Sequence, residues 1–196
     1  MKWKAITLVA LISCYLVAGD RKTCAQTGTP GNASIKEAQA LVQQAQHVCA
    51  NTPEHRQFDF WIGEWEVRNS EGQPGAGQAV GTSSIQRIID SCVVYENYSE
   101  GEDFTGKSFN FYDPTLRKWR QTWVDNTARV SEFVGEYKDG AMRFEGESHL
   151  PNGAKVLRHM TLFNLGPDRV RQLSEASRDG GKTWRVNYDY TYVRKK

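Results

Sequence analysis

The sequence predicts an all-β protein, an antiparallel up-and-down β-barrel of about 8–10 strands preceded by one short α-helix. From Gln57 onward the spacing of apolar residues changes from the helical period of about 3.6 to the strand period of about 2. The dipeptides Asp139-Gly140 and Asn152-Gly153, which suit two-residue type I′ turns, separate successive strand-like segments. No helical segment comes between these strands, which excludes a parallel sheet. Closing such a meander into a barrel removes its exposed edges.

Residues 1–19 have the pattern of a signal peptide. Lys2 and Lys4 supply a positive start, and the apolar run over 5–18 is shorter than the ~20 residues that span a bilayer. Small residues at the end of the run predict simple cleavage there, and a lipobox-like segment that ends at Cys14 offers a lipid anchor at Cys14 as the alternative. Either route exports the chain to the periplasm or the extracellular space. No transmembrane segment is expected in the rest of the chain.

Residues 20–33 are polar and rich in threonine and glycine, so we expect a flexible tether. Ser34 and Glu37 have the spacing of a capping box, and apolar residues at helical spacing follow, which predicts an N-terminal helix over 34–50. The barrel domain is expected over 57–196. Its predicted strands are 57–68, 78–89, 91–99, 106–112, 117–125, 128–138, 141–150, 154–164, 168–177 and 182–194.

The first of these strands contains an irregularity. The apolar residues before Gly63 alternate on one face, whereas Trp65 and Val67 after it are out of phase by one. We therefore expect a bulge or a sharp bend at Gly63, which would place both sets inside the barrel.

The charge of the chain argues against two classes of partner. Its formal net charge is +2, and removal of the leader with its two lysines lowers this to 0. A near-neutral chain without a basic cluster is not expected to bind nucleic acid or an anionic membrane surface.

Cysteine positions predict one disulfide. In an exported protein thiols tend to pair. Cys49 precedes the first strand and Cys92 lies in the first hairpin region, so a Cys49–Cys92 bridge would pin the N-terminal helix to the barrel. Free or differently paired thiols are the alternative. No CxxC or Cys/His spacing suggests a metal site, and no cofactor is expected.

The two histidines of the barrel domain are not expected to bind a metal together. A two-residue turn at Asn152-Gly153 would place Glu147 opposite Arg158 as a solvated ion pair. The same register keeps His149 and His159 apart.

Several motifs carry a resemblance to a known family. Gly63-Glu64-Trp65 resembles the G-x-W signature of lipocalins and other calycins, in which the tryptophan lies beneath an arginine of the last strand. Arg194 is the matching residue here. Together with 58–65, Cys92, Glu96, 121–125 and 177–184, the signature resembles a family of exported bacterial calycin-like domains of unknown function. The resemblance covers Cys49 to the C-terminus and implies a calycin-like barrel, but it supplies no catalytic residue.

The segment 177–184 also resembles the Asp-box of sialidases. One copy in a chain too short for a propeller argues against a sialidase. We interpret the segment as a stable turn, in which Asp179 accepts backbone amides and Trp184 packs beneath the loop.

Strand alternation identifies polar side chains that share a face with residues too apolar to leave in water. Because Trp119 and Trp123 share one face of the 117–125 strand, we expect that face to point into the barrel. Similar reasoning applies to three other strands. The predicted cavity lining is Glu96, Asn110, Trp119, Gln121, Trp123, Asp125, Arg171 and Glu175. Tryptophans with a few amides and carboxylates are typical of a small-molecule pocket, although the same groups could form a self-satisfied network that fills the barrel.

Three functional hypotheses follow. The first is an exported lipocalin-like protein that binds a small apolar or amphipathic ligand in its barrel. The second is an interaction module with a filled barrel, and the third is an enzyme that uses Glu96, Asp125 or Glu175 as acid or base. No nucleophile, phosphate-binding or dinucleotide motif occurs, so no residue is assigned a catalytic role.

Overall fold

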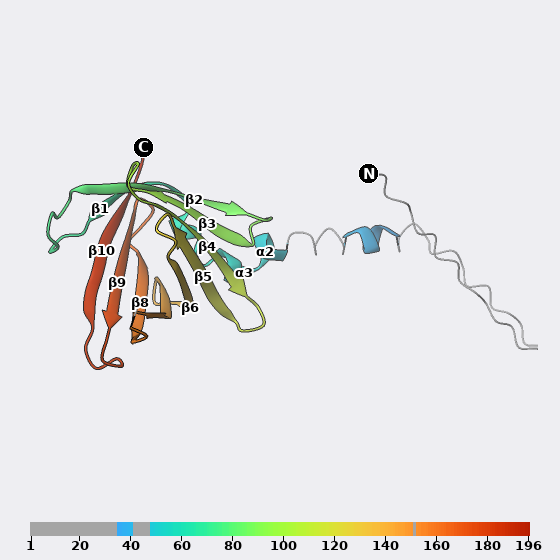
Figure 1. Cartoon of the computed structure of the whole chain (residues 1–196). Coiled ribbons are helices and arrows are strands. Elements are labelled where there is room, and N and C mark those ends of the chain that lie inside the picture. The colour runs from blue at the N-terminus through green and yellow to red at the C-terminus, as the bar shows by residue number, and fades with distance from the viewer. Residues whose placement is uncertain (1–34, 41–47, 151) are drawn as a thin grey trace, which may run out of the picture. The chain divides into compact units, whose positions relative to one another are not determined.

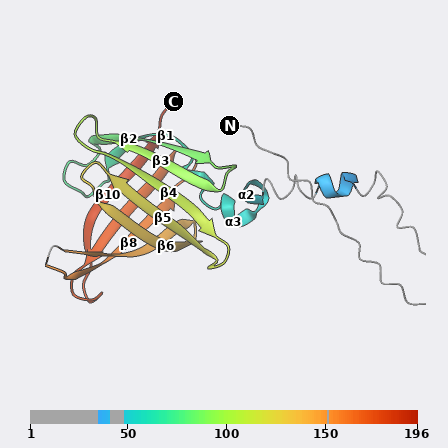
Figure 2. The same cartoon turned by 45° about the vertical axis from the view of Figure 1, so that its right-hand side comes forward.

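The computed structural model describes residues 35–40, 48–150 and 152–196. Its ten strands are antiparallel, follow one another in chain order, and close into a barrel where β1 pairs with β10 (Figures 1 and 2). The predicted all-β, up-and-down barrel is confirmed, with the strand number at the upper end of the expected range. This topology is compatible with a calycin-like fold.

The strands agree with the predicted ranges to within about three residues, apart from the start of the first. They are β1 (Gly63–Asn69), β2 (Ala79–Ile88), β3 (Val93–Ser99), β4 (Thr105–Asp113), β5 (Lys118–Asp125), β6 (Val130–Lys138), β7 (Ala141–His149), β8 (Lys155–Asn164), β9 (Arg169–Ser177) and β10 (Arg185–Arg194).

Short helices precede the barrel. Residues 35–40 are helical, and α2 (Val48–Asn51) and α3 (Pro53–Arg56) lie next to the first strands. The expected signal peptide with Cys14, the tether over 20–33, Ser34 and residues 41–47 of the expected helix lie outside the described residues. Among the described residues, no helix is both long enough and apolar enough to cross a membrane.

The prediction of a strand over 57–62 is wrong. A turn and the 3₁₀-helix η1 (Asp59–Trp61) occupy this segment, and β1 begins only at Gly63. Phe58 and Trp61 are both fully buried because residues three apart lie on one side of a 3₁₀-helix. The turn is supported by an ion pair between Arg56 and Asp59 at 2.6 Å. The chain does change direction at Gly63, where φ is 140°, a value that glycine adopts more readily than other residues. The segment before this bend is a short helix and not the expected strand.

The predicted disulfide is present. Cys49 of α2 is bonded to Cys92 in the loop between β2 and β3, across a sequence separation of 43 residues. The bridge holds the two short helices against the barrel wall, next to the start of β3.

The hairpin turns explain one difference in register. Asp139 and Gly140 have φ of 51° and 72°, so they form the expected two-residue turn between Lys138 and Ala141. The next hairpin instead closes between Leu150 and Ala154, whose backbones are hydrogen-bonded at 2.9 Å.

The longer loop of this hairpin moves the β7–β8 register by one residue. Arg158 therefore lies opposite Gly146 rather than Glu147. Because a one-residue slip exchanges the two faces of a strand, the expected solvated Glu147–Arg158 pair does not form. Glu147 pairs with Lys155 at 2.8 Å instead.

The apolar core fills one end of the barrel interior. Phe58 packs against Trp119 and Phe144, with ring centroids 5.5 and 6.2 Å apart, and Trp61 lies 5.8 Å from Tyr192. Segment 57–62 thus closes this end from inside. The interior beyond it is less completely filled.

Candidate functional site: an internal cavity with a polar wall

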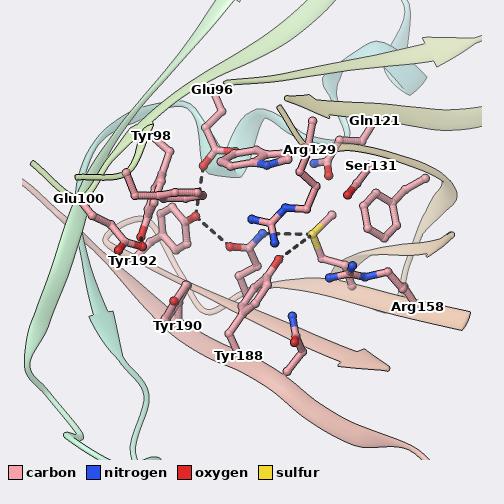
Figure 3. Close-up of a pocket in the computed structure, with 16 residues that line it drawn as sticks. Glu96, Tyr98, Glu100, Gln121, Arg129, Ser131, Arg158, Tyr188, Tyr190 and Tyr192 are labelled. Carbon is pink, nitrogen blue, oxygen red and sulfur yellow. Dashed lines mark hydrogen bonds between the residues drawn. The ribbon is translucent and has the colours of Figure 1, made fainter. Parts of the chain in front are cut away.

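The barrel encloses a cavity of about 380 Å³ (Figure 3). Its apolar surface comes mainly from aromatic rings, and its polar groups come from β3, β5, β6 and β8–β10. The lining residues are Glu96, Tyr98, Glu100, Phe104, Gln121, Trp123, Arg129, Ser131, Phe133, Arg158, Met160, Gln172, Asn187, Tyr188, Tyr190 and Tyr192. Glu100, Arg129 and Asn187 are exposed and mark the mouth.

Glu96 is a buried carboxyl in the cavity wall, 2% exposed. It accepts hydrogen bonds from Ser83 at 2.9 Å, Ser108 at 3.0 Å and Tyr192 at 3.2 Å. Burial raises the pKa of Glu96 to about 7, although these three hydroxyl groups act in the opposite direction by stabilising the carboxylate. Its hydrogen-bond partners are neutral hydroxyl groups, so hydrogen bonds rather than an ion pair stabilise its charged form.

A chain of hydrogen bonds crosses the cavity wall from Tyr192. Its hydroxyl lies 2.9 Å from Gln172 Oε1, and Gln172 Nε2 donates to Met160 Sδ at 3.1 Å. Tyr188 also donates to Met160 Sδ, at 3.6 Å. Burial raises the pKa of Tyr188 to about 12 and that of Tyr192 well above its ordinary value, so both phenols stay protonated and act as donors.

A second network holds the β4–β5 side of the wall. Gln121 Nε2 donates to Asn110 Oδ1 at 2.7 Å, and Asn110 Nδ2 donates to the carbonyl of Val94 at 3.0 Å. Asn110 is fully buried behind Gln121 and does not reach the cavity. Trp119 is also buried, with its indole donating to Gln57 at 3.1 Å. These two residues support the wall without lining it.

Trp123 and Asp125 lie near the mouth. The indole of Trp123 donates to Asp125 Oδ2 at 3.0 Å, and Arg129 pairs with the same carboxylate at 2.8 Å. Burial alone would raise the pKa of Asp125, but hydrogen bonds from Thr127, Trp123 and Arg129 prevail and hold the pKa well below its usual range. Asp125 therefore orients Trp123 and neutralises Arg129, and it does not line the cavity.

Three of the eight predicted lining residues reach the cavity: Glu96, Gln121 and Trp123. Two others are placed on the wrong face. Arg171 and Glu175 point outward, because Gln172 and Ser174 between them are the buried residues of β9. Arg171 binds the carboxylate of Asp189 in a bidentate pair, at 2.9 and 2.7 Å.

Sequence reasoning missed most of the β10 side of the cavity. Tyr188, Tyr190 and Tyr192 alternate along this strand, and that period was the available signal. Arg158 was missed because its inward orientation depends on the β7–β8 register. Glu100 and Arg129 lie outside the strands, where alternation gives no information.

The residues expected to have structural roles lie away from the cavity mouth. The Arg194 guanidinium carbon is 4.1 Å from the centroid of Trp65, and Arg194 also donates to the carbonyl of Ile62 at 3.0 Å. A Cβ at Gly63 would overlap Arg194, which explains the glycine there. The apolar end of the barrel is thereby covered by an arginine that also ties β10 to the start of β1.

The turn over 177–184 is organised by Asp179. Its carboxylate accepts the Thr183 amide at 2.9 Å and hydroxyl protons from Thr183 and Ser177 at 2.6 and 2.8 Å. Hydrogen bonds from Thr183 are the main reason that the pKa of Asp179 falls to about 2. Trp184 stacks on His159, with ring centroids 3.6 Å apart.

No protein-family model matches the chain, and no curated protein matches it. Among the described residues, no group of three His, Cys, Asp or Glu side chains could hold a metal ion. The class of protein is therefore defined by its own geometry: a closed ten-stranded antiparallel barrel with a ligand-sized internal cavity.

Proposed function

We propose that this chain is an exported lipocalin-like protein that binds a small amphipathic ligand inside its barrel. The observation that carries the proposal is the cavity of about 380 Å³, in which aromatic rings surround a few oriented polar groups. The Cys49–Cys92 bridge supports export, because disulfides persist in oxidising compartments.

The cavity walls supply both affinity and orientation. Burial of the ligand's apolar surface contributes about 25 cal/mol per Å², and Trp123, Phe133 and Tyr190 provide the matching apolar surface. Their positions are fixed by bonds such as the one from Trp123 to Asp125. Ten strands exceed the eight of lipocalins, and a larger strand number widens a barrel and leaves more interior space.

The same cavity counts against an interaction module with a filled barrel. That alternative requires side chains to occupy the interior, as they do at the closed end around Phe58 and Trp61. Beyond that end, small residues such as Ser131 contribute to the wall and leave the space open.

Native mass spectrometry of the protein purified from its own host tests the proposal. We expect a reproducible adduct that denaturing extraction releases. Ser131→Phe, which fills the cavity, should remove the adduct, whereas Thr122→Phe on the outward face of β5 should retain it. An adduct that persists in a folded Ser131→Phe variant would place the ligand elsewhere and refute the proposal.

An acid–base enzyme is the second candidate, favoured by one observation. Glu96 lies in the cavity wall and its pKa is raised to about 7 by burial, which suits proton transfer at neutral pH. A carrier should give the same adduct in wild type and in Glu96→Gln. An enzyme should accumulate unreacted substrate in Glu96→Gln, so a difference in adduct mass between the two proteins would favour catalysis.

A further inference from the structure

Arg158 is a cavity cation without a partner. It projects inward from β8, and its Nε is buried without a hydrogen-bond acceptor. Among the described residues, no carboxylate forms an ion pair with it within 4.0 Å. Burying a donor without an acceptor is costly, so the Nε–H of Arg158 favours an acceptor that comes from outside the chain.

The residues beside Arg158 supply no partner for it. Its direct neighbours are Gly146 on β7 and Ala176 on β9, neither of which has a side chain able to pair with it. The ring of Phe133 packs over Gly146, at 2.8 Å from the position that a Cβ would take. The free volume near Arg158 is therefore that of the cavity itself, which Arg158 lines.

The other charged groups of the cavity are already satisfied. Arg129 forms an ion pair with Asp125 at 2.8 Å, and Glu96 accepts hydrogen bonds from three hydroxyl groups. Glu100 accepts the hydroxyl proton of Tyr98 at 2.8 Å. Among the described residues, Arg158 is thus the charged residue of this lining that forms neither a hydrogen bond nor an ion pair with its side chain.

A second donor lies on β10, which is separated from β8 by β9 alone. The hydroxyl of Tyr188 donates to the thioether sulfur of Met160 at 3.6 Å. Because a thioether sulfur is a weak acceptor, an anionic oxygen of a ligand would replace it as the partner of this hydroxyl. Arg158 and Tyr188 extend into the cavity from β8 and β10 (Figure 3). Together they offer a guanidinium and a phenol to one acidic group, in the way that arginine binds carboxylates.

Competing carboxylates lie on the other side of the wall. Arg158 also borders a hollow of about 720 Å³, lined mainly by outward side chains of β5–β8 that include Glu145 and Glu147. Glu147 is already paired with Lys155. Glu145 lies across from His159 on the outward face.

We propose that the cavity binds an amphiphile whose polar end is a carboxylate, held by Arg158 with Tyr188 as second donor. This inference rests on the proposed function and names the chemical class of the ligand. The cavity volume of about 380 Å³ lies within the range of about 300–1,000 Å³ that is typical of small-molecule sites, which suits a ligand as small as a substituted naphthalene.

Two probes of this size, 2-naphthoate and 2-naphthamide, share one shape and differ in charge. Isothermal titration of the purified chain should show 2-naphthoate binding about tenfold or more tightly than 2-naphthamide, as expected for a hydrogen bond between charged groups. Arg158→Gln should weaken 2-naphthoate by about the same factor and leave 2-naphthamide within about twofold. Arg169→Gln, which removes the same charge from an exposed position of β9, should change neither.

The outcomes distinguish failure of the proposed binding function from failure of the carboxylate assignment. If neither probe binds, the proposed function fails for ligands of this size, and the inference fails with it. If both bind equally, or if the preference survives in Arg158→Gln, the carboxylate assignment is wrong while the binding function stands.

A direct measurement covers the case in which Arg158→Gln does not fold. The ¹⁵N-labelled Arg158 Nε–H resonance, assigned by its loss in Arg158→Lys, should shift with 2-naphthoate and stay unchanged with 2-naphthamide. An unchanged resonance while 2-naphthoate binds would overturn the proposal.

Discussion

Replacement of Glu96 by glutamine should change how the stability of the barrel depends on pH. Glutamine has nearly the same shape and keeps the cavity wall filled, but it carries no ionisable proton. In the wild type, the unfolded chain loses this proton near the ordinary value of 4.5, whereas the folded protein retains it until about pH 7. Between these values the folded state binds more protons, so the free energy of unfolding falls as pH rises.

The magnitude follows from the interval between the two pKa values. One pKa unit corresponds to about 1.36 kcal/mol, so the interval from 4.5 to about 7 gives about 3 kcal/mol. Relative to the wild type, Glu96→Gln should gain about this amount of stability between about pH 5 and about pH 8. Above about pH 8 the difference should stay constant, because Glu96 is then ionised in both states.

Urea unfolding followed by tryptophan fluorescence measures this difference, and the barrel domain has five tryptophans to report it: Trp61, Trp65, Trp119, Trp123 and Trp184. Burial lowers the pKa of His55, which gives stability an opposite dependence below 6.5, but this contribution is common to both proteins and cancels in the difference. The lowered pKa values of Asp179 and Asp189 act only below about pH 4.

Glu132→Gln removes an exposed carboxylate of β6 and is the matched control, expected to retain the wild-type pH profile. The reasoning is refuted if the stability difference between wild type and Glu96→Gln is the same at about pH 5 and at about pH 8.

Three further predictions concern the scaffold. Replacing both Cys49 and Cys92 by serine should lower the free energy of unfolding by about 4 kcal/mol, from the loop entropy of a 43-residue separation; urea midpoints measure this. Gly135→Ala places a Cβ against a backbone carbonyl of β7 and should cost about 1–3 kcal/mol, and unchanged midpoints would contradict the model of the β6–β7 contact. Asp179→Ala should accelerate hydrogen exchange of the Thr183 amide while leaving exchange in the barrel strands unchanged.

Features of the fold that depend on local rules could be predicted from the sequence. The period of 2 and the turn at Asp139-Gly140 are properties of neighbouring residues, and they locate nine strands and one hairpin register correctly. The same reasoning assigned segment 57–62 incorrectly, because the spacing of its aromatic residues fits both a strand, with a period of 2, and a 3₁₀-helix, with a period of 3. The choice between them is made by burial of Phe58 and Trp61 inside the closed barrel, which is a tertiary effect.

The candidate site could be predicted only in part, and β9 shows why. Alternation assigns a strand's faces only when one face is distinctly apolar, but polar residues occupy both faces of this strand. Gln172 and Ser174 are buried inside by hydrogen bonding, whereas Leu173 lies between them on the outward face. A sequence with this pattern carries no local signal that distinguishes its two possible orientations.

The polarity of the inner wall itself bears on function. A barrel that only needed to be filled would be more stable with apolar side chains, because buried polar groups at best recover their desolvation cost through hydrogen bonds. Here Glu96, Gln121 and Gln172 all have such bonds within the wall, which fixes their orientation before any ligand arrives. Arg158 is the exception, since its Nε has no acceptor. Among the charged residues of this lining, Arg158 is the one without a hydrogen bond or an ion pair to the described residues, so we expect the charge at that point to dominate ligand selection. The carboxylate test at Arg158 is for this reason the most informative one for this protein.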